Sequence, residues 1–228
     1  MPHRGQPTKP AAAERRTPRA STPPRVALAV PTGRDRAEYL RLREESAAWL
    51  EPWEPLLPGD QSPIADETFD RLIASCDTLT SRRFLMKLTI DSSLATKGTI
   101  VGQISLNNIA RGAFLSATLG YWIAGPYARQ GLMREGLTLA IAFAFAAADE
   151  APPQRRGLGL HRVEANIMPR NCASIGLVKS LGFRHEGTAQ RYLRIAGTWE
   201  DHERWALTTE EWPLHRRSRS KVQPDPRP

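Results

Sequence analysis

The spacing of apolar and polar residues predicts alternating strands and helices. Apolar runs of strand length occur at Val26–Val30, Phe84–Ile90, Thr99–Asn107, Leu119–Ile123 and Arg162–Ile167, and Arg191–Ile195 and Thr198–Leu207 form a hairpin pattern around Ala196-Gly197. Helical spacing occurs in Thr32–Trp49 (beginning near Asp35), Ile64–Cys76, Gln130–Ala148 and Asn171–Leu181, the last ended by Gly182. Prolines exclude a helix over Glu51–Pro58. This order predicts an α/β fold with a mixed central sheet of about six to seven strands, flanked by about four helices.

The two ends of the chain differ in composition from its centre. Residues 1–25 carry six Lys/Arg against one acidic residue, residues 213–228 carry five against one, and both are poor in apolar residues. We expect them to be disordered basic tails around one domain at residues 26–212. The formal net charge of +8 belongs mostly to these tails, and the centre of the chain is close to neutral, so the sequence pI of about 10.1 does not indicate a basic groove in the domain. The tails could contact a ribosome or RNA, or could serve only solubility.

Several classes of protein are disfavoured. Cys76 and Cys172 form no disulfide framework, and neither has metal-ligand spacing around it, so we expect no metal. The N-terminus lacks the apolar segment of a secretory signal, and the longest apolar run, Leu137–Ala148, is too short to cross a bilayer. We expect a cytoplasmic protein with no membrane or DNA partner.

The segment Leu119–Gly136 is typical of an anion site. It predicts a strand, a turn, and a loop through Gly131 that opens directly into a helix. The first N–H groups of a helix lack intrahelical partners, and the helix dipole favours negative charge there; Arg129 and Arg134 add positive charge. Because neither GxxxxGK[ST] nor GxGxxG occurs, the ligand would be a phosphate carrier other than a nucleoside triphosphate or a dinucleotide. A plain strand-to-helix turn is the alternative.

Two longer stretches carry a resemblance to a known family. LGYWIAGPYARQGLMREGL and HRVEANIMPRNCASIGLVKSLGF resemble the cofactor-binding half of the GNAT superfamily of acyl-CoA N-acyltransferases. WLEPWEP, near residue 50, and FRHEGTAQRYLRIAGTWEDHERWALT are similar to its RimJ-like branch, which acetylates the N-terminal alanine of a small-subunit ribosomal protein. The resemblance covers Val26–Trp212. It implies the GNAT fold, acetyl-CoA as co-substrate, and direct transfer of the acetyl group to a protein N-terminal amine.

The same resemblance implies where the cofactor would bind. The six positions of the superfamily's loop motif fall on Ala128–Met133, and the first and last depart from the general pattern. Main-chain N–H groups of the anion loop would hold the pyrophosphate; this loop is Arg129, Gln130, Gly131, Leu132, Met133 and Arg134. Trp122, Ile123 and Ala124 would pair with the pantetheine arm. Asn171 would hydrogen-bond that arm, or serve as an ordinary helix N-cap, and Ser174 would be the catalytic residue that assists the departing thiolate.

The general base is less well defined by the pattern. Relatives often carry an acidic residue where this chain has Arg191. Glu164, before the Asn171 helix, is the preferred candidate, and Asp201 and His202 on the last strand are alternatives. An α-amino group has a pKa near 7.7–8.0, so a weak base acting through water would suffice.

The residues expected to bind the acceptor follow from the family resemblance. Trp53, Glu54 and Tyr192 are expected to contact the acceptor, although packing against the sheet is the alternative for Trp49 and Trp53. Cys172 has no obvious histidine to activate it, so an acyl-cysteine route is not expected. The expected acceptor is a ribosomal protein N-terminus. An acetyltransferase of small amines or antibiotics, and a non-catalytic acyl-CoA-binding module, remain as alternatives.

Overall fold

One mixed sheet forms the centre of the molecule, whose computed structural model describes residues 23–55, 66–147 and 157–212. Its strands are β1 (Val26–Ala29), β2 (Arg82–Leu88), β3 (Ile100–Ala110), β4 (Ser116–Ile123), β5 (Arg162–Ile167), β6 (Arg184–Ile195) and β7 (Thr198–Thr208). They lie in the order β1-β2-β3-β4-β5-β7-β6, and β4–β5 is the parallel pair of this seven-stranded sheet. The mixed α/β architecture predicted from the sequence is confirmed.

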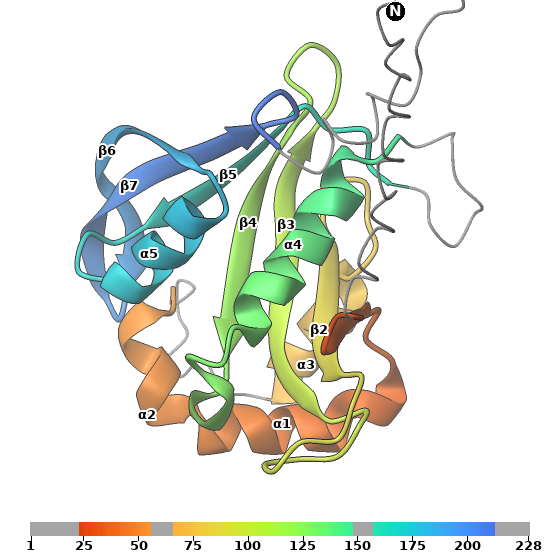
Figure 1. Ribbon diagram of the computed structural model, residues 1–228. Coiled ribbons are helices and arrows are strands. Elements are labelled where there is room, and N and C mark those ends of the chain that lie inside the picture. Colours follow the sequence, from red (N-terminus) through yellow and green to blue (C-terminus); the bar gives the residue numbers. More distant parts are fainter. Residues whose placement is uncertain (1–22, 56–65, 148–156, 213–228) are drawn as a thin grey trace, which may run out of the picture.

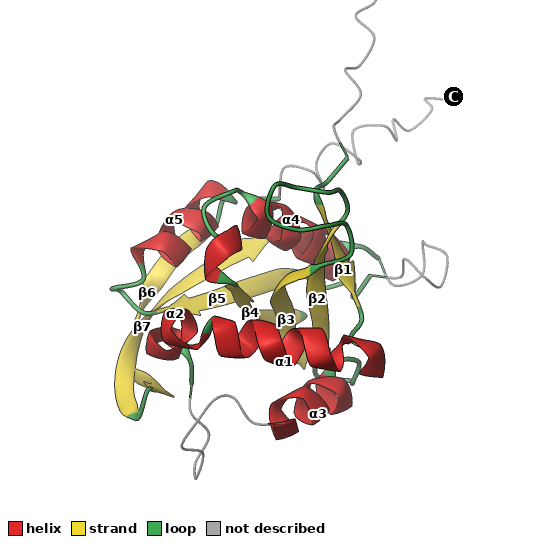
Figure 2. Cartoon of the chain, turned by 90° about the horizontal axis from the view of Figure 1, so that it is seen from below, coloured by secondary structure: helices red, strands yellow, loops and turns green. Residues whose placement is uncertain are grey.

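Helices cover both faces of the sheet. They are α1 (Arg36–Glu45), α2 (Ala47–Leu50), α3 (Asp66–Ser75), α4 (Leu132–Phe145) and α5 (Cys172–Ser180). Figure 2 shows α1 and α3 below the sheet, with α4 and α5 above it. Tyr39 and Phe69 of the lower layer pack with Leu85, whereas Leu137 and Ile141 of α4 belong to the larger core cluster. Burial of these apolar side chains on both faces holds the layers together.

Two predicted elements differ from the structure by more than a few residues at their ends. The helix predicted over Thr32–Trp49 is divided at Ser46, whose backbone (φ −100°, ψ 4°) leaves the helical region, so the described residues contain five α-helices rather than four. Strand β6 begins at Arg184, well before the predicted Arg191. It is an edge strand with most side chains exposed, so it lacks the apolar alternation that marks a half-buried strand.

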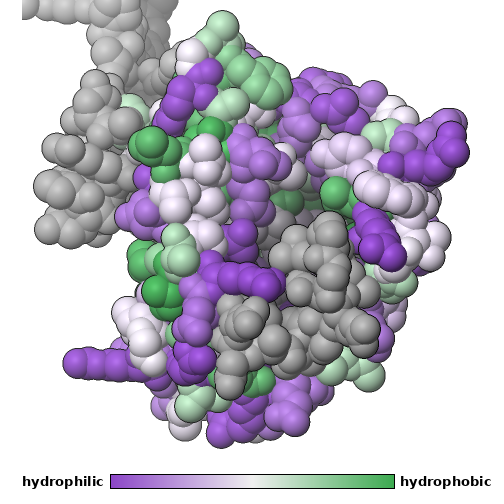
Figure 3. Space-filling view, turned by 180° about the vertical axis from the view of Figure 1, so that it is seen from behind, coloured by the Kyte–Doolittle hydropathy of each residue, from purple (hydrophilic) through white to green (hydrophobic). Residues whose placement is uncertain are grey.

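The predicted tails lie almost wholly outside the described residues, which leave out 1–22 and 213–228. Arg25, at the end of the predicted N-terminal tail, is described and forms an ion pair with Glu135 of α4. Within the described ranges no helix is both long and apolar enough to cross a membrane, and no group of three or more His, Cys, Asp or Glu could hold a metal ion. Figure 3 shows that, on the described surface seen from behind, apolar side chains are interspersed with hydrophilic ones.

The parallel pair β4–β5 is short and then separates. Its register runs from Ser116 opposite Arg162 to Leu119 opposite Ala165. Beyond these residues β4 continues beside β3 to Ile123, while β5 continues beside β7. Figure 1 shows the two strands diverging, with α4 following β4 and α5 following β5. The first turns of these two helices therefore come from opposite sides of the separation.

A charge network at the other end of β5 makes stability depend on pH. Glu186 accepts hydrogen bonds from Arg162 and Arg184, and the Arg162 bond is the main reason that the pKa of this carboxyl falls from 4.5 to about 2. Because the folded-state pKa is depressed, the stabilisation is complete above about pH 4.5 and is lost as the pH falls towards 2.

We expect Glu186→Gln to lower the free energy of unfolding at pH 7 by about 1–2 kcal/mol, the usual worth of a hydrogen-bonded charge pair. Urea unfolding at pH 7 and at pH 3 measures the effect, which should shrink at the lower pH. Glu44→Gln, at an exposed position of α1, is the control. An equal loss at both pH values would contradict the assignment.

Candidate active site

The anion loop and the start of α4 form an amide-lined turn. Gly131 is the N-cap of α4 and has a left-handed backbone (φ 79°), which a glycine adopts without strain. The first helical hydrogen bond of α4 runs from Glu135 N to Gly131 O (3.1 Å), so the N–H groups of Leu132, Met133 and Arg134 precede it. These amides and the helix dipole suit a phosphate group.

The charged side chains of the loop lie around this turn. Arg129 has a left-handed backbone (φ 60°) and an exposed side chain. Arg134 reaches from α4 to the end of α5, where its Nε donates to Ser180 Oγ (3.3 Å) and its Nη2 donates to the Ser180 carbonyl (3.4 Å). Arg134 therefore links the two helices that begin on opposite sides of the strand separation.

At the end of β4, one main-chain carbonyl is already hydrogen-bonded to a side chain. The Ile123 carbonyl, expected to face pantetheine, accepts a hydrogen bond from Trp49 Nε1 (3.1 Å). Ala124 N donates to Val101 O (3.0 Å). The side chain of Trp122 turns to the α1 side, where the Arg43 guanidinium lies 5.1 Å from its ring. Trp49 is about half exposed, so its contact with Ile123 lies at the surface.

Asn171 and Ser174 begin α5 on the other side of the separation. Asn171 is the N-cap, and its Oδ1 accepts a hydrogen bond from Ser174 N (3.1 Å). The capping role left open by the sequence is therefore present, and it leaves the Asn171 amide nitrogen as a possible donor to a ligand. The Ser174 hydroxyl is one turn into the helix and takes no part in this cap.

Tyr121, which the sequence analysis did not select, meets Ser174 across the separation. It lies on β4 two positions past the last residue paired with β5, and its hydroxyl is buried with no hydrogen-bond partner in the described residues. Burial raises the pKa of Tyr121 to about 12; the Ser174 hydroxyl is near enough to counteract this in part, but it does not meet the geometry of a hydrogen bond. An unpaired buried hydroxyl is costly, so Tyr121 indicates a polar site at this point.

We expect Tyr121→Phe to raise the Tm of the ligand-free protein by about 2–4 °C, corresponding to roughly 1 kcal/mol recovered from the unpaired hydroxyl. Differential scanning calorimetry measures it. Tyr127→Phe, at a less buried tyrosine, should leave Tm nearly unchanged. A lower Tm for the Tyr121 variant would show instead that its hydroxyl makes a stabilising bond.

Glu164 lies before the point where β4 and β5 separate, opposite Thr118. It is buried, and each of its carboxylate oxygens accepts from a guanidinium: Oε1 from Arg162 Nε (2.9 Å) and Oε2 from Arg204 Nη2 (3.3 Å). These contacts favour a structural role, and a role as general base would require the carboxylate to act from within this ion-paired group.

The alternative bases also have partners. Asp201 Oδ1 accepts from Arg191 N (2.7 Å), which holds the left-handed backbone of Arg191 (φ 47°) in the irregular part of the β6–β7 pair. His202 is buried; its Nδ1 lies 3.0 Å from the Glu200 carbonyl, and its ring lies 5.6 Å from that of Tyr192. His202 therefore contacts the predicted acceptor residue Tyr192.

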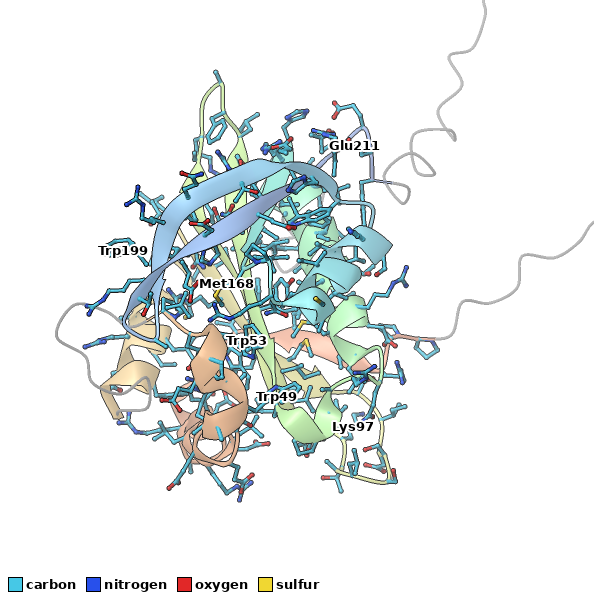
Figure 4. The ribbon with its side chains drawn as sticks, turned by 90° about the vertical axis from the view of Figure 1, so that its left-hand side faces the viewer. Trp49, Trp53, Lys97, Met168, Trp199 and Glu211 are labelled. Atoms are coloured by element: carbon cyan, nitrogen blue, oxygen red, sulfur yellow. The ribbon has the colours of Figure 1, made fainter. Side chains whose placement is uncertain are left out.

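The predicted acceptor residues lie where the loop after α2 meets the β6–β7 hairpin. Pro55 bridges to Ile195, and Ala196 N donates to the Glu54 carbonyl (3.3 Å). Figure 4 shows Trp53 and Met168 between α2 and this hairpin, whose tip carries Trp199. The structure thus brings two distant parts of the chain, the loop after α2 and the β6–β7 hairpin, together as one surface, here called the predicted acceptor surface.

The side chains of the predicted acceptor surface make different contacts. Glu54 forms a two-pronged ion pair with the buried Arg43 (Arg43 Nη2 to Oε2, 2.6 Å), so it holds α1 rather than pointing freely outward. The Trp53 ring lies 5.7 Å from the Arg170 guanidinium. The Tyr192 hydroxyl accepts from Asn166 Nδ2 (3.3 Å), and Asn166 Oδ1 is buried without a described partner. Asn166, just past the strand separation, is a further polar group that the sequence analysis missed.

Comparison with known proteins adds a family and relatives. A family model described as an acetyltransferase (GNAT) domain matches residues 25–184. Over 113 residues, the chain is 41% identical to the ribosomal protein uS5-alanine N-acetyltransferase of Escherichia coli K12, covering 50% of this chain and 53% of that protein. The chain therefore matches about half the length of this curated relative.

Two solved structures are similar over most of their length. Mycobacterium smegmatis RimJ, in complex with CoA-disulfide, is 30% identical with a TM-score of 0.71, covering 86% of this chain and 88% of that one. A ribosomal-protein-S5-alanine acetyltransferase from Vibrio fischeri is 25% identical with a TM-score of 0.66, covering 84% and 97%. The fold predicted by resemblance is therefore confirmed.

Proposed function

Because this chain belongs to the GNAT acetyltransferase family, we propose that it transfers the acetyl group of acetyl-CoA directly to the N-terminal amine of a protein. The predicted resemblance to the RimJ-like branch and the prediction of an acetyltransferase are confirmed at the level of the family. The proposed acceptor is the N-terminal alanine of a small-subunit ribosomal protein, which would place the enzyme in the cytoplasm. The relatives from Escherichia coli and Vibrio fischeri, named for that reaction, support this choice.

The separation of β4 and β5 carries the proposal. It places the anion loop on one side and Asn171 with Ser174 on the other. A CoA ester is long enough to use both: its pyrophosphate would lie on the amides of Gly131–Arg134, and its pantetheine arm would pass between the strands. CoA-disulfide bound to the Mycobacterium smegmatis relative supports this fit, and so does the Tyr121 hydroxyl, which has no hydrogen-bond partner among the described residues.

The residues at this site have defined tasks in such a reaction. The acceptor amine attacks the thioester carbonyl carbon, the carbon–sulfur bond breaks, and the sulfur leaves as a thiolate. The Ser174 hydroxyl would donate a hydrogen bond to that thiolate, which stabilises the charge as it develops. The amine must lose a proton; Glu164, or His202 beside Tyr192, would accept it directly or through water.

Thiol release from acetyl-CoA tests this function. The acceptors are a peptide beginning with alanine, the same peptide with a blocked N-terminus, spermidine and an aminoglycoside. We expect turnover on the free peptide alone, rising as pH passes the α-amino pKa near 7.7–8.0. Equal turnover on the small amines would contradict the N-terminal acceptor. Tight CoA binding without turnover on any acceptor would favour a non-catalytic binding module.

Contact of the basic tails with a ribosome stays a prediction, because residues 1–22 and 213–228 lie outside the described residues.

A further inference from the structure

Glu135 places a carboxylate in the first turn of α4, beside the anion loop. A carboxylate there stabilises the helix through its dipole, but the same field then offers less attraction to a bound anion. A pyrophosphate, which is itself negatively charged, would also be repelled by this side chain. A site for such a ligand at this helix therefore requires the charge of Glu135 to be neutralised.

Arg25 neutralises it from the start of the domain. Its main-chain N donates to Glu135 Oε2 (2.7 Å), and its Nε donates to Glu135 Oε1 (2.7 Å). Both carboxylate oxygens are thus engaged by one residue that lies far away in the sequence. The Arg25 side chain remains 40% exposed, so it also reaches solvent beside the loop.

The same guanidinium contacts the backbone of the anion loop. Arg25 Nη2 donates to the Gln130 carbonyl (2.8 Å), and a Cβ added at Gly131 would lie 3.2 Å from that nitrogen. In a planar trans peptide the carbonyl and the following N–H point in opposite directions. Fixing the Gln130 carbonyl towards Arg25 therefore directs the Gly131 N–H away from Arg25 and keeps it free of that side chain.

Arg25 is itself held in place by the neighbouring strand. Thr89 N donates to the Arg25 carbonyl (2.9 Å), and the Thr89 hydroxyl donates to the Pro24 carbonyl (2.7 Å). Thr89 directly follows β2, which pairs with β1 in the sheet. The Arg25 backbone is thus anchored beside the edge strand β1, which fixes the point from which its side chain reaches Glu135 and Gln130.

We propose that Arg25 is a positioning residue for the pyrophosphate of coenzyme A, acting by neutralising Glu135 and by fixing the Gln130 carbonyl. The inference rests on the proposed use of acetyl-CoA. It assigns a task in cofactor binding to a residue whose sequence context is that of a basic tail.

The test compares two acyl donors in wild-type protein and Arg25→Ala. We expect the Kd of CoA, measured by isothermal titration calorimetry, to rise about 10-fold or more, in line with losing a charge-assisted contact. At saturating acetyl-CoA, kcat should stay within about 3-fold of wild type. S-acetylpantetheine lacks the phosphates, so its kcat/KM should be unchanged, whereas general damage to the fold would lower it too.

A second substitution separates the neutralisation of Glu135 from the fixing of the Gln130 carbonyl. In the Arg25→Ala background, Glu135→Gln removes the uncompensated carboxylate, and we expect it to recover about 3-fold or more of the lost CoA affinity. Arg25→Lys keeps the charge but not the forked geometry, so its Kd should be intermediate; it also serves if the alanine variant does not fold. Arg36→Ala, which breaks an ion pair with Asp70 on the other face of the sheet, should leave the Kd unchanged.

Two results would overturn the role of Arg25: an unchanged Kd in Arg25→Ala, or an equal loss of activity with S-acetylpantetheine. Either result, with normal CoA binding by the wild-type protein, would leave the proposed function intact. Absence of CoA binding by the wild-type protein would instead refute the proposed function itself.

Discussion

Replacing Ser174 by alanine is expected to lower kcat about 100-fold, the usual cost of removing one hydrogen-bond donor to a charge that develops in the transition state. The Kd of acetyl-CoA should change by less than about 3-fold, because the contact strengthens only as the thiolate forms. Alanine keeps the main-chain N–H of residue 174, which donates a hydrogen bond to Asn171 Oδ1, so the N-cap of α5 is retained. Steady-state kinetics and calorimetry on the same preparation measure both quantities.

The control for this experiment lies in the same helical turn. Cys172 is exposed and free, and direct transfer gives its thiol no part in the reaction. Cys172→Ser should therefore keep kcat close to wild type. A loss of kcat in this variant, together with an active Ser174→Ala, would favour an acyl-cysteine route over direct transfer. A large loss of CoA binding in Ser174→Ala would mean that the hydroxyl is needed for the structure of the site.

Gly131→Val is expected to raise the Kd of acetyl-CoA about 100-fold, because a β-branched residue rarely adopts a left-handed backbone and the loop must rearrange. The native φ is 79°, and a Cβ would also press on Arg25 Nη2 at 3.2 Å. Both changes move the amides that would hold the pyrophosphate. Calorimetric titration with CoA measures the effect.

Gly112→Val provides a matched control. Gly112 also has a positive φ (68°), it lies in the β3–β4 turn, and a Cβ there meets no atom within 4 Å. Both variants should lose stability through the same backbone strain, but only the Gly131 variant should lose CoA affinity. Equal CoA affinity in the two variants would show that the anion loop does not bind the pyrophosphate.

The sequence predicted those parts of the fold that local patterns determine. The apolar strand at Arg162–Ile167 has the predicted bounds, and Asn171 begins a helix as its capping chemistry requires. The first half of β6 was missed, because an exposed edge strand pairs through its backbone without burying alternate side chains. The break at Ser46 was also missed, because serine in a helical pattern weakens the helix without excluding it.

The candidate site was predictable where a motif lies in one segment. The anion loop is such a segment, and its left-handed Gly131 agrees with the prediction of a tight turn before a helix. The contacts of Arg25 with Glu135 and Gln130 were not predictable, since they join residues far apart in the chain. Tyr121 stood within a recognised motif, yet only the structure shows that its hydroxyl is buried without a hydrogen-bond partner among residues 23–55, 66–147 and 157–212.

The short β4–β5 register has a consequence for how ligand binding affects the stability of this protein. Four residue pairs join β4 to β5, and the proposed ligand would touch α4 on one side of that junction and α5 on the other. A bound acyl donor would then contact both halves of the sheet, and its binding would increase the free energy of unfolding of the protein. Amide hydrogen exchange at Thr118 and Glu164 should slow when CoA binds. The ligand-free protein would keep a looser junction, through which the donor can enter.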